Sequence, residues 1–99
     1  MTGKFEAHIT VDRQYAKAVE TIGGELGGWV YSQISGCPIL GQGTYCYLSA
    51  FGTNDIILLA RVTVAEQQLQ RHGVPVLRSK IERIVYDTKT NVNEVRVQL

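Results

Sequence analysis

The stretch that decides the fold is the first apolar segment, Phe5-Glu-Ala-His-Ile-Thr-Val11, in which apolar and polar side chains alternate. Alternation with a period of two is typical of a β-strand that is buried on one face and open on the other. The apolar face carries Phe5, Ala7, Ile9 and Val11. The polar face carries Glu6, His8 and Thr10. We therefore expect the segments that follow to cover the apolar face.

A helix is expected directly after this strand. Asp12 suits the helix N-terminus because its carboxylate can accept hydrogen bonds from the free amides of the first turn. Apolar side chains then recur at spacings of three and four, as in an amphipathic helix: Tyr15, Ala18, Val19, Ile22 and Leu26. Glycines at 23–24 and 27–28 leave the end of this helix open, because glycine costs about 1 kcal/mol inside a helix.

The rest of the chain predicts three strands, a second helix and a short edge strand. Residues 29–35 and 44–51 are rich in aromatic and β-branched side chains, and the glycine-rich segment 36–43 suits a wide hairpin between them. A helix starting at Asn54 or Asp55 has an apolar stripe, and Gly73 with Pro75 ends it. The members of this stripe are Leu58, Val62, Ala65 and Leu69. Residues 76–86 predict a long strand, and 94–99 predict a short edge strand.

The order β-α-β-β-α-β predicts one α+β domain over residues 1–99 with the ferredoxin-like split β-α-β arrangement. In that fold the sheet order is fourth, first, third, second strand, and both helices lie on one face of an antiparallel sheet. The opposite face is then open to solvent or to a partner.

Strand alternation assigns side chains to the two faces of this sheet. The helix-covered face is expected to take Val30, Ile34, Cys46, Leu48, Ala50, Leu77, Ile81 and Val85 with the apolar set of the first strand. The open face is expected to take Trp29, Tyr31, Gln33, Tyr45, Tyr47, Phe51, Arg78, Lys80 and Glu82 with Glu6, His8 and Thr10. The open face is therefore rich in aromatic and charged side chains.

Composition excludes several function classes. Ten basic and nine acidic residues give a net charge of +1, which leaves no strong field to attract a polyanion, so we do not expect nucleic acid as a partner. No apolar run approaches the roughly 20 residues that span a bilayer, and no secretory signal is evident. Two cysteines and two histidines show no metal-ligand spacing, so we expect no metal and no cofactor. The expected location is the cytoplasm.

The open face predicts a subunit interface, a binding site for a small phosphorylated ligand, or both. With the first strand central, His8 and Thr10 lie beside Arg78 and Lys80, which could neutralise anionic oxygens. The rings that would form the walls of such a site are Tyr31, Tyr45 and Tyr47. Interfaces enrich tyrosine, tryptophan and arginine, so a homo-oligomer, most simply a dimer, is favoured. We expect ligand binding or association without turnover.

Two resemblances bear on function. His8-Ile-Thr10 resembles the His-x-Thr/Ser signature of the 2H phosphoesterase superfamily, whose members pair two ferredoxin-like lobes with one motif each. The resemblance implies His8 as a catalytic acid or base on a cyclic phosphate or phosphodiester. A second motif is absent, because His72 is followed by Gly73-Val-Pro75, so only a dimer could supply two such histidines. Residues 5–11 and 78–82 are also similar to a family of small bacterial proteins with no established activity.

A third alternative is single-stranded RNA binding on the sheet aromatics. Tyr45 and Tyr47 fall on a middle strand, as the stacking aromatics of RNA-binding domains of this topology do. The characteristic basic-Gly-aromatic signature is missing around Gly43-Thr-Tyr-Cys-Tyr47. RNA binding therefore ranks behind association and small-ligand capture.

Overall fold

The computed structural model describes residues 4–37, 40–85 and 95–98 of the chain. The elements, in chain order, are β1 (Lys4–Asp12), the 3-10 turn η1 (Arg13–Tyr15), α1 (Ala16–Leu26), β2 (Val30–Cys37), β3 (Gly41–Gly52), α2 (Asp55–Arg71), β4 (Arg78–Val85) and β5 (Val95–Gln98). All strand pairings are antiparallel. The α+β class and the ferredoxin-like order are confirmed.

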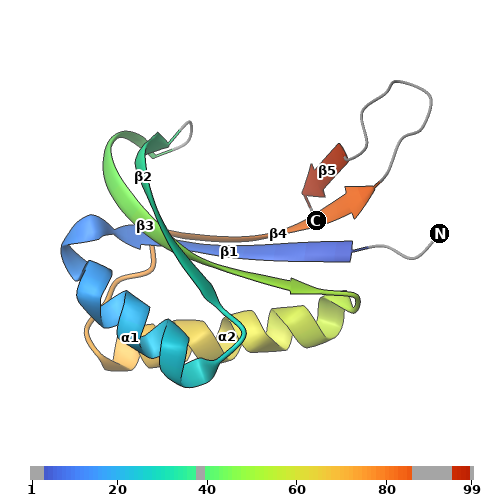
Figure 1. The fold of residues 1–99 in the computed structure, drawn as a ribbon, viewed down its shortest axis with the longest axis horizontal. Coiled ribbons are helices and arrows are strands. Elements are labelled where there is room, and N and C mark those ends of the chain that lie inside the picture. Colours follow the sequence, from blue (N-terminus) through green and yellow to red (C-terminus); the bar gives the residue numbers. More distant parts are fainter. Residues whose placement is uncertain (1–3, 38–39, 86–94, 99) are drawn as a thin grey trace.

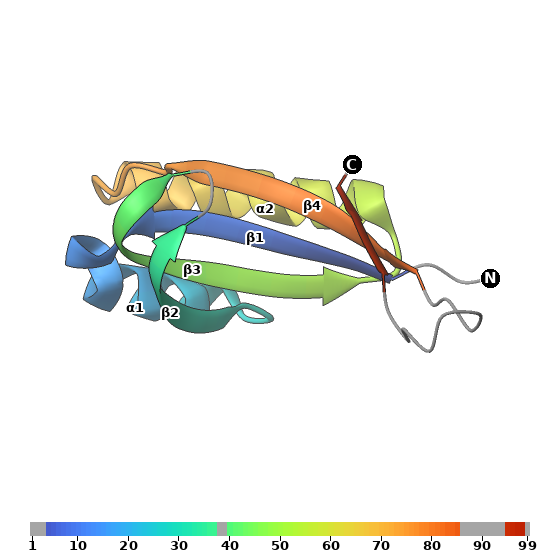
Figure 2. The ribbon, with the colours of Figure 1, turned by 90° about the horizontal axis from the view of Figure 1, so that it is seen from above.

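The strands form one sheet in the order β2-β3-β1-β4-β5. This is the expected order with β5 added at the edge beside β4. Both helices lie on the same side of the sheet, and β1 runs through its middle (Figure 1). Seen from above, β4 and α2 follow one long side of the molecule, while β2 and α1 follow the other (Figure 2). The sheet therefore has one helix-covered face and one open face.

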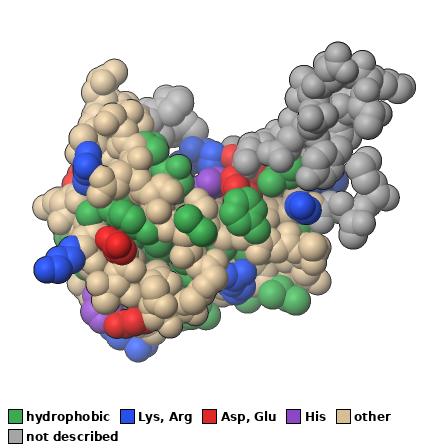
Figure 3. Space-filling model, in the orientation of Figure 1, with side chains coloured by type: hydrophobic (Ala, Val, Ile, Leu, Met, Phe, Trp, Pro, Cys, Tyr) green, Lys and Arg blue, Asp and Glu red, His purple; other side chains and the backbone are tan. Residues whose placement is uncertain are grey.

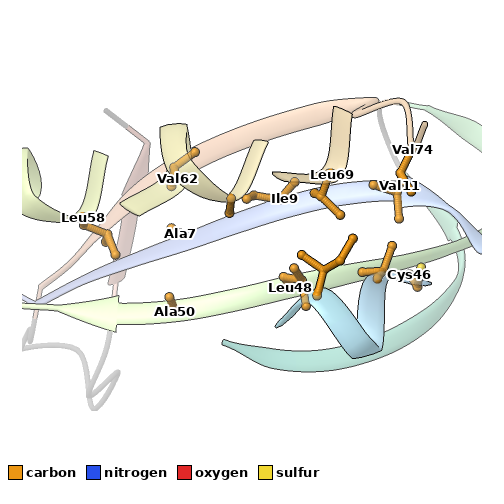
Figure 4. Close-up of a cluster of buried hydrophobic side chains, with 13 residues drawn as sticks. Ala7, Ile9, Val11, Cys46, Leu48, Ala50, Leu58, Val62, Leu69 and Val74 are labelled. Carbon is orange, nitrogen blue, oxygen red and sulfur yellow. The ribbon is translucent and has the colours of Figure 1, made fainter. Parts of the chain in front are cut away.

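The core lies between the helices and the apolar face of β1, as alternation predicts. Ala7, Ile9 and Val11 are fully buried, and β3 adds Cys46, Leu48 and Ala50 beside them. The expected stripe of α2 is buried in full: Leu58, Val62, Ala65 and Leu69. Figure 4 shows these side chains meeting between the strands and the helices. The two strands and α2 therefore supply most of the apolar contact.

The predicted helix boundaries have clear local causes. Asp12 Oδ1 accepts a hydrogen bond from the Gln14 amide at 2.9 Å, which caps the turn that leads into α1. Asn54 Oδ1 accepts one from the Ile57 amide at 3.0 Å and caps α2. Gly73 follows α2 with a φ of 75°, a left-handed conformation that favours glycine and ends the helix.

The face assignment of β2 is wrong in the sequence analysis. Directly paired residues of antiparallel strands point to the same face, and Tyr31 pairs with the core residue Leu48. Tyr31 and Gln33 therefore lie on the helix-covered side, whereas Val30 and Ile34 lie on the open face. Both alternating sets of this strand contain apolar side chains, so alternation alone does not choose between them. The larger apolar area of the Tyr31 ring is the one that packs against the core.

Contacts at the start of β2 favour this arrangement. The Arg61 guanidinium lies 5.5 Å from the centre of the Trp29 ring and donates a hydrogen bond to the Gly28 carbonyl at 3.1 Å. Trp29, expected on the open face, packs against the core instead.

Leu77 is a further correction. It was expected on the helix-covered face, but it precedes β4 and is exposed, while Val76 packs against the core. The side chain of Val85 lies outside the described part of the structure.

Two adjacent glycines in α1 provide a test of this packing. A Cβ at Gly23 would lie 2.7 Å from Leu48 Cδ2, whereas a Cβ at Gly24 would meet nothing within 4 Å. Gly24→Ala should raise the free energy of unfolding by about 0.5–1 kcal/mol through helix propensity. Gly23→Ala should lower it by about 1–2 kcal/mol, because the fully buried Leu48 has little room to move. Urea unfolding measures both, and equal effects would contradict the close approach of α1 to β3.

Candidate binding face

The open face is the sheet surface that the helices leave uncovered. The side chains that strand register places on it include Glu6, His8, Thr10, Val30, Ser32, Ile34, Tyr45, Tyr47, Ser49, Phe51, Arg78, Lys80 and Glu82. In Figure 3, acidic, basic and histidine side chains lie close together beside hydrophobic ones near the middle of the sheet. The open face therefore combines charge of both signs with apolar surface.

The register brings most of the predicted site residues together. His8 pairs directly with Lys80 of the neighbouring strand β4. Thr10 pairs with Arg78 of β4 and, across its other edge, with Tyr47 of β3. Tyr45 lies on this face but is buried, and its hydroxyl donates to the Leu40 carbonyl at 3.1 Å. Tyr31 is not among them, because it lies on the helix-covered side. Whether these residues bind a ligand stays a prediction.

His8 is held by hydrogen bonds at both ring nitrogens. Nε2 lies 2.5 Å from Glu6 Oε1, and Nδ1 lies 2.9 Å from Ser49 Oγ. The edge of the ring meets Tyr47, with centroids 5.5 Å apart and an interplanar angle of 72°. A neutral ring that carries its proton on Nε2 satisfies both contacts, donating to Glu6 and accepting from the Ser49 hydroxyl. The imidazole is therefore an integral part of a polar network.

Two carboxylates form the other part of this network. Glu6 and Glu82 pair directly across β1 and β4, and they are only 5% and 8% exposed. Like charges in such a pair repel, and opposite charges next to them offset the repulsion. Lys80 Nζ lies 2.5 Å from Glu82 Oε1, and His8 contacts Glu6. We call Glu6, His8, Lys80 and Glu82 the charged cluster.

Sequence reasoning placed Lys80 in the site but missed three members of this surface as functional residues: Glu6, Ser49 and Glu82. Glu82 and Lys80 repeat, at the same spacing of two, the pairing of Glu6 and His8 on the neighbouring strand. That repeated spacing is the signal that could have identified the charged cluster. Ser49 was overlooked because it lies among larger aromatic residues of β3, although alternation places it on the same face as Tyr47 and Phe51.

A shallow hollow of about 440 Å³ opens above the charged cluster. The residues that line it are Glu6, His8, Val30, Ser32, Tyr47, Ser49, Phe51, Lys80 and Glu82. Its centre is ionic and hydrogen-bonded, while Val30 and Phe51 supply apolar surface. The hollow therefore suits a partner that brings both apolar groups and charges of both signs.

Cys46 lies on the opposite side of β3 and belongs to the core. Burial raises the pKa of its thiol, and a hydrogen bond with Tyr31 lowers it only in part. The thiol therefore stays protonated at neutral pH and is no nucleophile. Within residues 4–37, 40–85 and 95–98, no group of three or more His, Cys, Asp or Glu side chains is arranged so that it could hold a metal ion. Nor does the described chain contain a helix whose length and apolar character would let it cross a membrane.

Comparisons with known proteins bear on the fold alone. No protein-family model matches the chain, and no curated protein matches its sequence. The chain is similar in structure to a crystal structure provisionally named a chlorite dismutase, with a TM-score of 0.51 and 9% sequence identity. The match covers 87% of this chain but 44% of that one. The similarity supports a ferredoxin-like arrangement and gives no support to the 2H phosphoesterase resemblance.

The coupling between His8 and Glu6 can be measured directly. Replacing His8 with leucine removes one partner of a nearly buried carboxylate, so it should lower the free energy of unfolding by about 1–3 kcal/mol. In the Glu6→Gln background the same change should cost about 1 kcal/mol less, because the residue left behind is uncharged. A double-mutant cycle by chemical unfolding measures this difference. Additive effects would show that the contact contributes nothing to stability.

Proposed function

We propose that this protein is a homodimer that associates through its open face. The observation that carries the proposal is the apolar surface beside the charged cluster. Val30 and Phe51 are 56% and 55% exposed, although they adjoin carboxylates that are almost fully buried. Contiguous exposed apolar surface rimmed by polar groups is typical of a protein interface.

Charge on the open face fits a second copy of the same chain. In a two-fold interface the same surface meets itself, so it must be self-complementary. The charged cluster contains two carboxylates, one ammonium group and one imidazole within two adjacent strands. A two-fold axis near this cluster can place Lys80 of one copy against a carboxylate of the other. A face of single sign would repel its copy, and this one does not.

The shape of the molecule sets the size of a face-to-face interface. Its principal extents are 45 × 30 × 18 Å, and the shortest axis runs across the strands, so the open face is long and narrow (Figure 2). A stable interface typically buries about 800 Å² on each partner, so face-to-face association would use most of the length of this face. The interface would bury apolar surface at Val30 and Phe51 while the hydrogen bonds of His8 stay in place.

Phe51→Asp tests the dimer. The change buries a new carboxylate against an apolar partner surface, so it should weaken association at least tenfold. Sedimentation equilibrium should give twice the 11.0 kDa chain mass for the native protein and the single chain mass for the variant.

The matched control for this test is Leu59→Asp. Leu59 is also 55% exposed, but it lies on α2, on the helix-covered side of the sheet. This variant should remain dimeric. A native protein that stays monomeric at hundreds of micromolar contradicts the proposal, as does a dimer that survives Phe51→Asp and dissociates with Leu59→Asp.

A second candidate is capture of a small phosphorylated ligand on the same face. The cross-strand pairs that join His8 to Lys80 and Thr10 to Arg78 favour it, because two cations and a hydroxyl then share one patch. The nearly buried carboxylates of Glu6 and Glu82 oppose it, because they repel an anion and Glu82 already pairs with Lys80. We therefore rank anion binding second, and catalysis by His8 and RNA binding behind it. A cytoplasmic location stays a prediction.

Titration with inorganic phosphate tests this second candidate. Saturable NMR shifts at the amides of His8, Thr10 and Arg78 are expected, and Arg78→Gln should weaken them at least threefold. Arg83→Gln is the matched control, because Arg83 pairs with Phe5 and belongs to the helix-covered side. Absence of these shifts, or equal weakening by both variants, would remove anion binding from consideration.

A further inference from the structure

A second hollow lies on the other side of the sheet, between α2 and β4. It has a volume of about 390 Å³, and its apolar wall is formed by Ile56, Leu59, Val62 and Ile81. Ile56 and Leu59 are exposed, unlike the buried stripe of the same helix. We call this hollow the α2–β4 groove. It opens on the opposite side of the sheet from the open face, because Ile81 pairs with the core residue Ala7. Lys80 lines both hollows.

The groove adjoins a stretch of sheet edge that the described strands leave open. β5 pairs with Glu82–Val85 only, and within the described ranges no strand lies outside residues 78–81 of β4. Ser79, Lys80 and Ile81 in this stretch also line the groove. Alternate amide and carbonyl groups of an edge strand point outward and are available to a further strand. Hydrogen-bonding backbone and apolar surface therefore lie side by side.

We propose that the α2–β4 groove and the open edge of β4 bind an extended peptide of a partner protein as an added strand. Backbone hydrogen bonds to residues 78–81 would fix the peptide, and alternate side chains would point into the groove. The central groove-facing side chain would be a large aliphatic one, in contact with Ile56, Leu59 and Ile81. This surface and the proposed dimer interface lie on opposite sides of the sheet and share Lys80 of β4.

The charges at the groove specify the flanking residues of the peptide. Two acidic side chains of α2 line the groove, Asp55 at the start of the helix and Glu66 eleven residues on. Lys80 also lines it, but the ammonium group of Lys80 pairs with Glu82. A rise of 1.5 Å per residue separates the backbones of Asp55 and Glu66 by about 16 Å. Residues i and i+4 of an extended peptide point the same way and lie about 13 Å apart. Long basic side chains at these two positions can make up the difference and reach both carboxylates. The fitting pattern is therefore basic–x–aliphatic–x–basic.

A second copy of this chain fits the edge less well. Antiparallel pairing of two such edges would bring Arg78 and Lys80 of both copies close together across the new pair. Like charges opposite one another destabilise a strand pair, and lysine on an edge is a common means of preventing self-association. A heterologous peptide avoids this repulsion.

The probe for the test is the synthetic peptide acetyl-Lys-Thr-Leu-Thr-Lys-amide, titrated into the isotope-labelled protein. We expect saturable NMR shifts at the amides of residues 78–81 and at the methyl groups of Ile56 and Leu59. Leu59→Ser should weaken binding at least fivefold. Val64→Ser should leave it unchanged, because Val64 is 48% exposed on the same helix but does not line the groove.

Backbone N-methylation distinguishes strand addition from simple adsorption. One peptide is N-methylated at both threonines and the other at the central leucine. Successive N–H groups of an extended strand point to opposite edges, so the two peptides lose hydrogen-bond donors on opposite edges. Strand addition predicts that only one of the two loses binding, since only one edge faces β4. Loss of both or of neither overturns the proposal.

Three further outcomes would also overturn it. The first is that no shifts appear at millimolar peptide. The second is that a peptide with glutamate in place of both lysines binds equally well. The third is that the same amides shift on changing the concentration of the Phe51→Asp variant without peptide, which would assign the edge to a second copy. Repeating the titration with Phe51→Asp separates these results from the fate of the dimer, because that residue lies on the opposite side of the sheet.

Discussion

The structure depends on the burial of one face of β1. This strand has β3 on one side and β4 on the other, so its backbone hydrogen bonds are taken up within the sheet. Ala7, Ile9 and Val11 are fully buried under the helices. Because side chains alternate strictly, Glu6, His8 and Thr10 must then point to the open face. A shift of one residue would place a carboxylate in the core and expose an isoleucine, so the same constraint that forms the core also fixes the charged cluster.

The charged cluster is tolerated because every member has a partner. No buried side-chain nitrogen or oxygen among residues with described positions lacks a hydrogen bond. Glu6 and Glu82 would repel each other directly across the strands, and the Lys80 ammonium beside Glu82 and the contact of His8 with Glu6 offset this repulsion. Composition alone gives no sign of this partly balanced arrangement. It favours a partner of mixed charge over a strongly anionic one.

The sequence predicted the core residues of β1 and α2. β1 has one apolar set, and Ala7, Ile9 and Val11 of that set are fully buried, while Phe5 is partly buried. α2 also carries exposed apolar side chains, and its buried stripe was predicted from the spacing of three and four residues. β2 has apolar side chains in both alternating sets, and its orientation depends on its pairing with β3, which no local pattern reveals. Alternation places Ser49 and Glu82 on the open face, but only the cross-strand register brings them beside His8 and Glu6. Gly23, which local propensity treats as a helix breaker, is retained because Leu48 packs against it.

The two proposed surfaces share one strand, and this links them physically. Lys80 points to the open face, while Ser79 and Ile81 point toward α2, so β4 contributes to both. A peptide strand added beside residues 78–81 would extend the sheet next to Lys80 and enlarge the open face available to a second copy. If the added strand changes the affinity of dimerisation, dimerisation must change the affinity for the peptide by the same factor. The small net charge of the chain makes such coupling depend on local contacts at β4 rather than on long-range attraction.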